Sequence, residues 1–167
     1  MPEMSVHSSE TIDASASTVM AALEDFRTWP VWSPWLYTEP DATVTYEGEA
    51  GKPGHGYQWQ GNKVGAGSMS LQSRDERNLH LDLEFLKPFK SQADVSFALD
   101  SPTPESTTVT WTMDSKLPFF MFFYKATMVG MIRSDYRRGL MMLKDYLEHG
   151  EVLSNVKIEA IADCPAS

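Results

Sequence analysis

Titratable side chains that could do chemistry are few in this sequence and poorly grouped. His80, Asp82 and Glu84 form a His-x-Asp-x-Glu row, a pattern that could hold a metal or act in acid–base catalysis. These residues alternate with the apolar residues of Leu79–Phe85, so we predict that they share the solvent face of a strand. A zinc site needs three or four suitably spaced ligands, and we find no such cluster. We therefore predict neither a metal nor a cofactor.

Nucleophilic catalysis has little support either. The single cysteine, Cys164, lies near the end of the sequence, and no Gly-x-Ser-x-Gly elbow occurs. The best candidates for a catalytic acid or base are Tyr57, Tyr136 and Asp135. Tyrosine hydroxyls more often satisfy a buried partner or orient a ligand than transfer protons. The sequence therefore favours binding over catalysis, with catalysis as the alternative.

Strands are the clearest elements of the sequence. Apolar and polar residues alternate along Leu79–Phe85, Ala93–Leu99 and Thr108–Met113, which predicts antiparallel strands with one buried face. Weaker patterns predict further strands at Ser5–Ile12, Ala42–Glu47, Tyr57–Gln60 and Gly67–Arg74. The glycines between Gly48 and Gly67 predict hairpin turns, because they do not follow a phosphate-binding pattern.

Two helices flank the strands. A short helix begins near Ser15 or Ser17, with Ser17 the expected N-cap, and a long amphipathic helix runs from Met128 to a stop at Gly150. Between the short helix and the next strand lies FRTWPVWSPWLY, whose prolines predict short helical pieces. We expect Trp29 and Trp32 to be buried plugs in this segment and Trp35 to reach a ligand.

One long helix packed on a curved antiparallel meander predicts a two-layer α+β domain. The inward positions are rich in aromatic residues and in methionine, which adapts to irregular apolar shapes. They either fill a solid core or line a cavity, with Leu117–Tyr124 as a gate over its mouth. The predicted ligand-contacting residues are Trp35, Tyr57, Trp59, Met69, Leu83, Phe85, Phe97, Trp111, Met113, Phe119, Phe123, Met128, Met131, Ile132 and Tyr136.

The net charge and the hydropathy of the sequence limit the kinds of partner that this protein can bind. The 167 residues carry a formal net charge of −9, which disfavours nucleic acid, and no stretch is long and apolar enough for stable membrane insertion. One cysteine and the absence of a signal-peptide pattern favour a cytoplasmic location. The sequence leaves the oligomeric state open.

Short segments in a specific order carry a family resemblance. They are Ile12–Ala14, Asp25–Trp35, Gly61–Gly67, Leu86–Phe89, Thr110–Trp111 and Arg138–Lys144. Together they resemble the START-like polyketide cyclase/dehydrase (SRPBCC) superfamily. The resemblance implies a helix-grip fold, with a seven-stranded antiparallel sheet wrapped around a long C-terminal helix and enclosing a hydrophobic cavity. It places the domain at residues 1–150 and leaves 151–167 as a tail.

Three functions follow as hypotheses. The first is a carrier or sensor of a hydrophobic small molecule, such as a lipid, a polyketide or an aromatic compound. The second is a metal-independent cyclase or dehydratase acting on a polyketide-like substrate. The third is an acidic protein-interaction module that uses exposed aromatic residues, namely Phe119, Phe120, Phe122 and Phe123.

Overall fold

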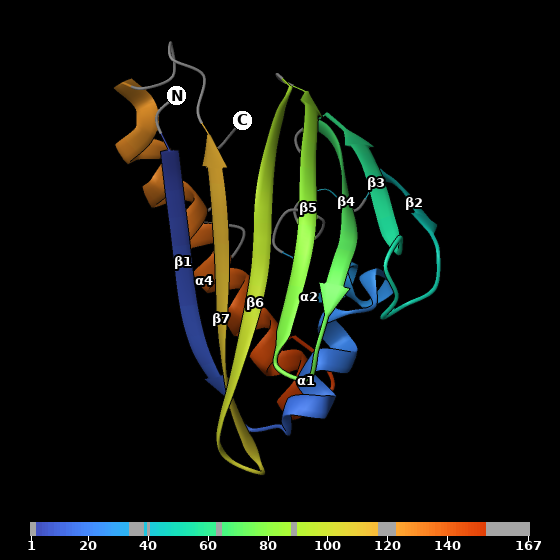
Figure 1. Ribbon diagram of the computed structural model, residues 1–167, viewed down its shortest axis with the longest axis vertical. Coiled ribbons are helices and arrows are strands. Elements are labelled where there is room, and N and C mark those ends of the chain that lie inside the picture. Colours follow the sequence, from blue (N-terminus) through green and yellow to red (C-terminus); the bar gives the residue numbers. More distant parts are fainter. Residues whose placement is uncertain are drawn as a thin grey trace.

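The computed structural model describes residues 3–33, 39, 41–62, 65–87, 90–116 and 123–152. Its strands are β1 (Glu3–Ile12), β2 (Thr43–Glu47), β3 (Gly56–Gly61), β4 (Gly65–Arg74), β5 (Asn78–Lys87), β6 (Ser91–Thr103) and β7 (Ser106–Lys116). Its helices are α1 (Ala16–Leu23), the 3-10 turn η1 (Phe26–Thr28), α2 (Trp29–Trp32) and α4 (Lys125–His149). The predicted α+β helix-grip fold is confirmed, with one seven-stranded sheet and a long C-terminal helix (Figure 1).

The sheet is antiparallel throughout, in the order β1-β7-β6-β5-β4-β3-β2. The first strand pairs with the last, with Glu3 opposite Lys116 and Ile12 opposite Thr107. The sheet therefore has two distinct ends. We call them the α1 end, where β1 passes into α1, and the Lys116 end, where β7 stops and α4 begins above it (Figure 1).

The two faces of the sheet differ as the alternation predicts. On β5, Leu79, Leu81 and Leu83 are buried on the inner face. His80 and Asp82 lie between them on the outer face, with His80 exposed and Asp82 half-buried. The prediction that the His-x-Asp-x-Glu row faces solvent is therefore correct, because a strand turns successive side chains to opposite sides.

Helix α1 begins at the earlier of the two expected positions, two residues before Ser17. Ser15, and not Ser17, is the N-cap: its backbone is extended and its hydroxyl accepts a hydrogen bond from the Thr18 N–H at 3.3 Å. Ser17 already lies inside the helix, so its hydroxyl only reaches back to Ser15 Oγ. Both serines fit the N-cap preference, and only the backbone turn at Ser15 decides between them.

Helix α4 is about 37 Å long, from its 25 residues at about 1.5 Å each. It starts three residues before the predicted position and ends at Gly150, whose φ of 81° suits glycine. Near its C-terminus, Lys144 Nζ donates to the Thr11 carbonyl oxygen at 2.8 Å, and Glu148 accepts from the Asp13 N–H at 3.0 Å. The helix thereby closes over the α1 end.

Candidate ligand-binding site

The α1 end of the interior is filled by a cluster of rings that we call the aromatic plug. It comprises Phe26, Trp29, Trp32, Phe97 and Trp111, all fully buried. Trp29 meets Trp111 edge-on at 5.9 Å between ring centroids, and Trp32 does the same at 5.8 Å. Edge-to-face pairs are favourable beyond the area they bury. This end of the interior is therefore a packed core.

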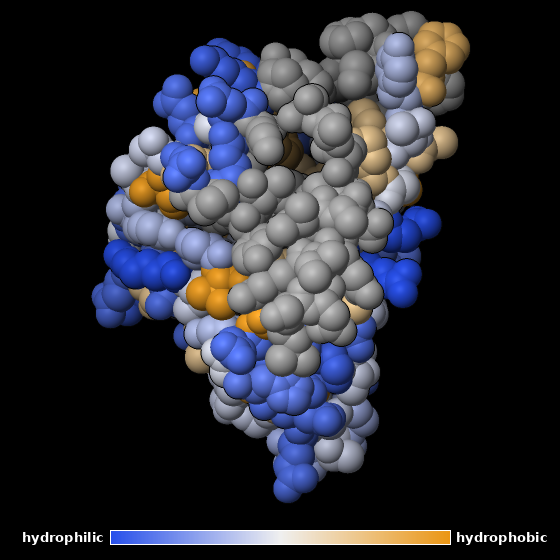
Figure 2. All heavy atoms as spheres, turned by 180° about the vertical axis from the view of Figure 1, so that it is seen from behind, coloured by the Kyte–Doolittle hydropathy of each residue, from blue (hydrophilic) through white to orange (hydrophobic). Residues whose placement is uncertain are grey.

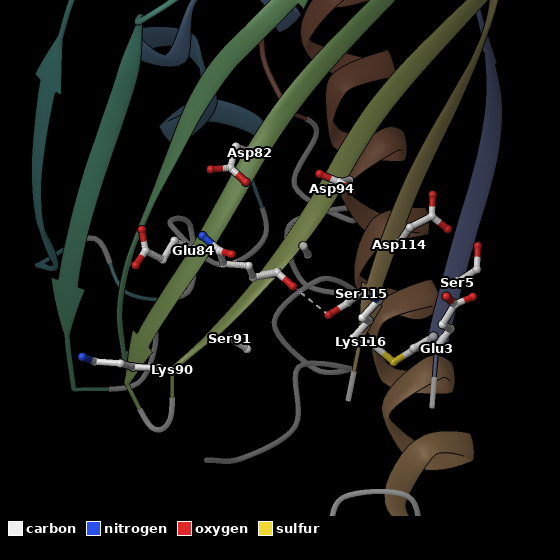
Figure 3. Close-up of a pocket in the computed structure, with 13 residues that line it drawn as sticks. Glu3, Ser5, Asp82, Glu84, Lys90, Ser91, Asp94, Asp114, Ser115 and Lys116 are labelled. Atoms are coloured by element: carbon white, nitrogen blue, oxygen red, sulfur yellow. Dashed lines mark hydrogen bonds between the residues drawn. The ribbon is translucent and has the colours of Figure 1, made fainter. Parts of the chain in front are cut away.

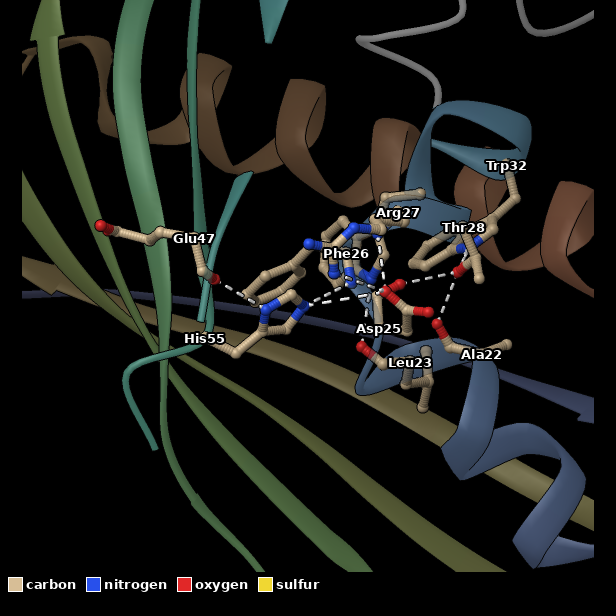
Figure 4. Close-up of polar contacts among 10 residues, drawn as sticks. Ala22, Leu23, Asp25, Phe26, Arg27, Thr28, Trp32, Glu47 and His55 are labelled. Carbon is tan, nitrogen blue, oxygen red and sulfur yellow. Dashed lines mark hydrogen bonds and ion pairs between the residues drawn. The ribbon is translucent and has the colours of Figure 1, made fainter. Parts of the chain in front are cut away.

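The indole N–H groups of Trp29 and Trp32 have local partners. Trp29 Nε1 donates to the Leu23 carbonyl oxygen at 3.1 Å, and Trp32 Nε1 donates to Thr28 Oγ1 at 3.4 Å. Thr28 in turn donates to the Ala22 carbonyl oxygen at 2.6 Å (Figure 4). Both tryptophans are thus tied to the chain that carries them, which supports their predicted role as plugs.

His55 holds the loop between β2 and β3 against this plug (Figure 4). The Phe26 N–H donates to His55 Nε2 at 3.0 Å, so that nitrogen must carry a lone pair. The proton therefore sits on Nδ1, which donates to the Glu47 carbonyl oxygen at 2.9 Å. The ring also stacks on Phe26 at 4.8 Å. His55 is a neutral structural residue, with Asp25 as a polar neighbour at 3.8 Å.

Side chains on the inner face become more exposed toward the Lys116 end. Met69 and Leu83 are only 5% exposed, whereas Trp59 and Phe85, farther along the same face, are half-buried. The facing side of α4 follows the same gradient, from fully buried Leu140 through Tyr136 to half-buried Ile132 and Met128. The interior between sheet and helix is therefore packed at the α1 end and less buried around Trp59, Phe85, Ile132 and Met128. Met4 and Ala93, toward the Lys116 end of β1 and β6, remain buried.

Gly67 makes room for one wall of this space. It lies opposite Trp59 in the β3–β4 pair, and a Cβ at Gly67 would come within 2.6 Å of the Trp59 ring. The absent side chain lets the indole lie flat against the β4 backbone. Trp59 then meets Phe85 edge-on at 5.9 Å, which places two large rings at the open part of the inner face.

Two tyrosines are the polar groups of this wall. Burial raises the pKa of the Tyr57 hydroxyl above its ordinary value of 10, and the nearby Tyr46 adds to the effect. Burial also raises the pKa of Tyr136, with further contributions from Tyr57 and Asp135. Both phenols are therefore neutral at physiological pH. Among the described residues, the Tyr57 hydroxyl has no hydrogen-bond partner, which leaves it able to donate to a ligand.

Asp135, the third candidate acid or base, lies beside Tyr136 on α4. Its carboxylate pairs with Arg138 at 2.6 Å, and Arg138 also donates to Ser134 Oγ at 2.6 Å. Both charged side chains are about 90% buried, so each depends on the other for compensation. Any use of Asp135 as a proton acceptor would have to break this pair.

The predicted ligand-contacting residues divide into three sets. Tyr57, Trp59 and most of the others lie on the inner face or on the facing side of α4. Phe123 and Met131 lie at the start of α4 with exposed side chains. Trp35 and Phe119 fall outside the described residues, as do Phe120, Phe122 and most of the predicted tail.

A hollow of about 900 Å³ lies over the outer face of the sheet near the Lys116 end (Figure 3). Asp82, Asp94 and Asp114 lie in one row across it, opposite one another in the strand register. Lys90 and Lys116 lie at its rim (Figure 3). Its polar lining differs sharply from the apolar inner face, so this hollow does not suit a hydrophobic ligand.

Comparison with known proteins decides the family. The family described as "Polyketide cyclase / dehydrase and lipid transport" matches residues 3–148. This chain belongs to that family. The match spans every described strand and nearly all of α4, so the family fold and the observed fold coincide. A search of curated proteins found no match to this member of the family.

Solved structures agree with the family at the level of the fold. A protein from Mesorhizobium loti has a TM-score of 0.65 at 14% identity, covering 88% of this chain and 98% of that one. The Aha1 dimer from Colwellia psychrerythraea has a TM-score of 0.62 at 18% identity, covering 88% and 98%. DynU16, from the dynemicin biosynthetic locus, has a TM-score of 0.60 at 18% identity, covering 90% of this chain and 49% of DynU16. This family member thus spans about half the length of DynU16.

Sequence inspection missed His55 and Gly67. The partners of His55 are backbone groups of Phe26 and Glu47, 29 and 8 residues away, so no pattern of side chains reveals them. Gly67 was expected where a glycine-rich turn passes into a strand, and it lies within β4. The run of small residues from Gly65 to Ser68 is the signal that could have indicated a close approach by a ring.

Proposed function

We propose that this protein binds one uncharged, hydrophobic small molecule between the inner face of the sheet and the N-terminal half of α4, as a carrier or sensor. The observation that carries the proposal is an apolar wall that ends in half-buried Trp59 and Phe85 and includes the neutral Tyr57 hydroxyl. Ligand pockets combine such apolar surface with a few polar groups that fix orientation. Membership of a family of cyclases, dehydrases and lipid-transport proteins supports the same class of ligand.

The chemistry of the wall narrows the ligand further. Its side chains are aromatic, aliphatic or thioether groups, so a charged ligand would lose hydration without gaining an ion pair. Aromatic rings favour a flat, polarisable molecule, and methionines adapt to its outline. A neutral phenol donates a hydrogen bond and suits a carbonyl or hydroxyl oxygen on the ligand. An aromatic compound bearing one such oxygen fits all three conditions.

Equilibrium dialysis with 2-naphthol and 2-methylnaphthalene tests this proposal, because the two probes share a shape and differ in the oxygen. For Tyr57→Phe, we expect about fivefold weaker binding of 2-naphthol and unchanged binding of 2-methylnaphthalene, the effect of one hydrogen bond. Tyr146→Phe, on the C-terminal half of α4, is the matched control and should change neither affinity. Equal loss of both probes, or no loss of either, would reject the role given to Tyr57.

Catalysis is the second candidate function. A buried neutral phenol can act as a general acid toward a carbonyl oxygen, which is the kind of help that a cyclisation or dehydration needs. Tyr57 and Tyr136 are the residues that would provide it, and Asp135 is held in its pair with Arg138. Under this hypothesis Tyr57→Phe abolishes turnover of a polyketide-like substrate while binding falls only severalfold. Under the carrier hypothesis no turnover is detected in either protein.

A further inference from the structure

We propose that Gly67 is a specificity-determining residue of the proposed ligand site, which it keeps wide enough for a molecule of fused rings. The inference rests on the proposed function, because it assigns a role within the same site. Gly67 lies between Trp59 and Phe85 on the inner face of the sheet, and we call these three residues the aromatic ledge. A side chain at position 67 would displace the Trp59 ring and restrict the site to single-ring ligands.

The register of three neighbouring strands builds the aromatic ledge. Gly67 of β4 is opposite Trp59 of β3 and also opposite Phe85 of β5, and these strands lie side by side in the sheet (Figure 1). Residues directly opposite one another on paired strands share one face of the sheet. The two rings therefore flank a position without a side chain. They meet across it edge-on, with their centroids 5.9 Å apart and their planes at 84°.

An irregularity in the β4–β5 pairing holds Phe85 in this row. Ala66 is opposite Lys87, whereas Gly67 is opposite Phe85, so Leu86 is an extra residue in the ladder. Such a bulge redirects the side chains around it. Leu86 is 47% exposed and Lys87 is also exposed, so Phe85 is the last side chain of β5 on the inner face.

The space above Gly67 is already occupied by the indole of Trp59. A Cβ at this position would lie 2.6 Å from Trp59 Cζ2, 2.7 Å from Trp59 Cη2 and 2.5 Å from the Glu84 carbonyl oxygen, so the indole would have to move. The Phe85 ring on one side and the Tyr57 ring on the other, with its centroid at 5.6 Å, restrict sideways movement. The indole would therefore be lifted away from the sheet, into the space proposed for the ligand.

Fused rings need the flat position of this indole. Tyr57 and Trp59 are successive inner residues of β3, so a ligand whose oxygen accepts from the Tyr57 hydroxyl and whose rings extend along β3 meets the ledge. Offset stacking on such rings is favourable. The apolar surface continues past the ledge, because Val44 of β2, opposite Trp59, is half-buried and hydrophobic residues reach the surface on this side of the molecule, at the left of Figure 2. A single-ring ligand bonds Tyr57 without reaching the ledge, so only fused-ring ligands depend on Gly67.

Equilibrium dialysis with 2-naphthol and p-cresol tests the proposal, because the two probes share a hydroxyl group and differ in the number of rings. For Gly67→Ala, we expect binding of 2-naphthol to weaken about tenfold or more and binding of p-cresol to change by less than about twofold. Gly130→Ala is the matched control, because a Cβ there has no atom within 4 Å, and it should change neither affinity. Equal loss of both probes, or no loss of 2-naphthol, would overturn the role of Gly67.

Removal of the displaced ring separates a role in the site from a general effect on folding. Trp59→Leu should weaken binding of 2-naphthol about threefold, since one ring contact is lost. In that background Gly67→Ala should weaken it by less than about twofold more, whereas additive losses would contradict the proposal. If circular dichroism shows that Gly67→Ala does not fold, Trp59→Leu alone decides, and an unchanged affinity for 2-naphthol in that variant rejects the ledge.

Binding to the unmodified protein distinguishes this inference from the proposed function. If neither probe binds, the proposed function and the role of Gly67 both fail. If both probes bind and Gly67→Ala weakens them equally, the proposed function stands and only the role of Gly67 is rejected.

Discussion

At the scale of single residues, His55 and Tyr57 lie on either side of the first residue of β3 and have different roles. His55 uses both ring nitrogens on backbone groups, so its hydrogen-bonding capacity is exhausted within the protein. Tyr57, two residues later, has a neutral hydroxyl with no partner among the described residues. His55 therefore stabilises the packed interior at the α1 end, whereas the Tyr57 hydroxyl is available to a ligand.

His55→Ala should lower the free energy of unfolding by about 2–4 kcal/mol. The substitution leaves the Phe26 N–H and the Glu47 carbonyl buried without their partner, and it opens a gap beneath the Phe26 ring. Urea unfolding measures the change. His80→Ala, on the exposed outer face, is the control and should stay within about 0.5 kcal/mol of the parent. A loss of less than about 1 kcal/mol for His55→Ala would contradict the structural role of this histidine.

At the scale of elements, α4 closes the fold by clasping the junction of β1 and α1. Lys144 Nζ pairs with the carboxylate of Glu148, one helical turn later, at 2.7 Å. Lys144 also donates to the Thr11 carbonyl oxygen, and Glu148 also accepts from the Asp13 N–H. The hydrogen bond that Lys144 donates to the Glu148 carboxylate is the main cause of the raised pKa of Lys144. Burial raises the pKa of Glu148, but the Asp13 N–H and Lys144 outweigh it, so the pKa lies below its ordinary value of 4.5.

The lowered pKa of Glu148 predicts how the free energy of unfolding depends on pH. A carboxyl whose pKa is lowered on folding contributes stability above its unfolded pKa, and that contribution disappears as the pH falls through the folded pKa. We therefore expect Glu148→Gln to lower the free energy of unfolding by about 1 kcal/mol near pH 7 and by almost nothing near pH 3. Urea unfolding at both pH values measures the difference.

Glu49→Gln is the control for this clasp, because Glu49 pairs with Lys52 on the surface with most of its side chain exposed. An exposed pair contributes little, so the control should change stability by less than about 0.5 kcal/mol at either pH. If Glu148→Gln were equally destabilising at both pH values, the charge of Glu148 would have no part in the clasp.

Strands and helices with a regular spacing of apolar residues were predictable from the sequence. The residues that line the candidate site were predictable only in part. Alternation along Leu79–Phe85 identifies a strand and its inner face, because the period of two is set by the backbone itself. The close approach of Trp59 to Gly67 depends on strand register, which no single segment encodes. The N-cap at Ser15 likewise depends on the backbone turn that follows β1.

At the scale of the whole molecule, the two faces of the sheet differ in burial and in chemistry. The interior is packed with rings at the α1 end and becomes more exposed toward the Lys116 end. On the outer face, Asp82, Asp94 and Asp114 lie in one row across the hollow near the Lys116 end. The apolar inner face and the acidic outer face therefore lie on opposite sides of the same sheet, and only the inner face suits the ligand that we propose.

The measurement that tests the central claim most directly is methyl NMR of the methionines during titration with 2-methylnaphthalene. Met69, Met113 and Met128 lie on the proposed wall, whereas Met20 and Met142 are buried elsewhere in the core. We predict that the three wall methyl signals shift and saturate at one equivalent, while the other two stay in place. No shift at the wall, or equal shifts of all five signals without saturation, would contradict a single internal ligand site.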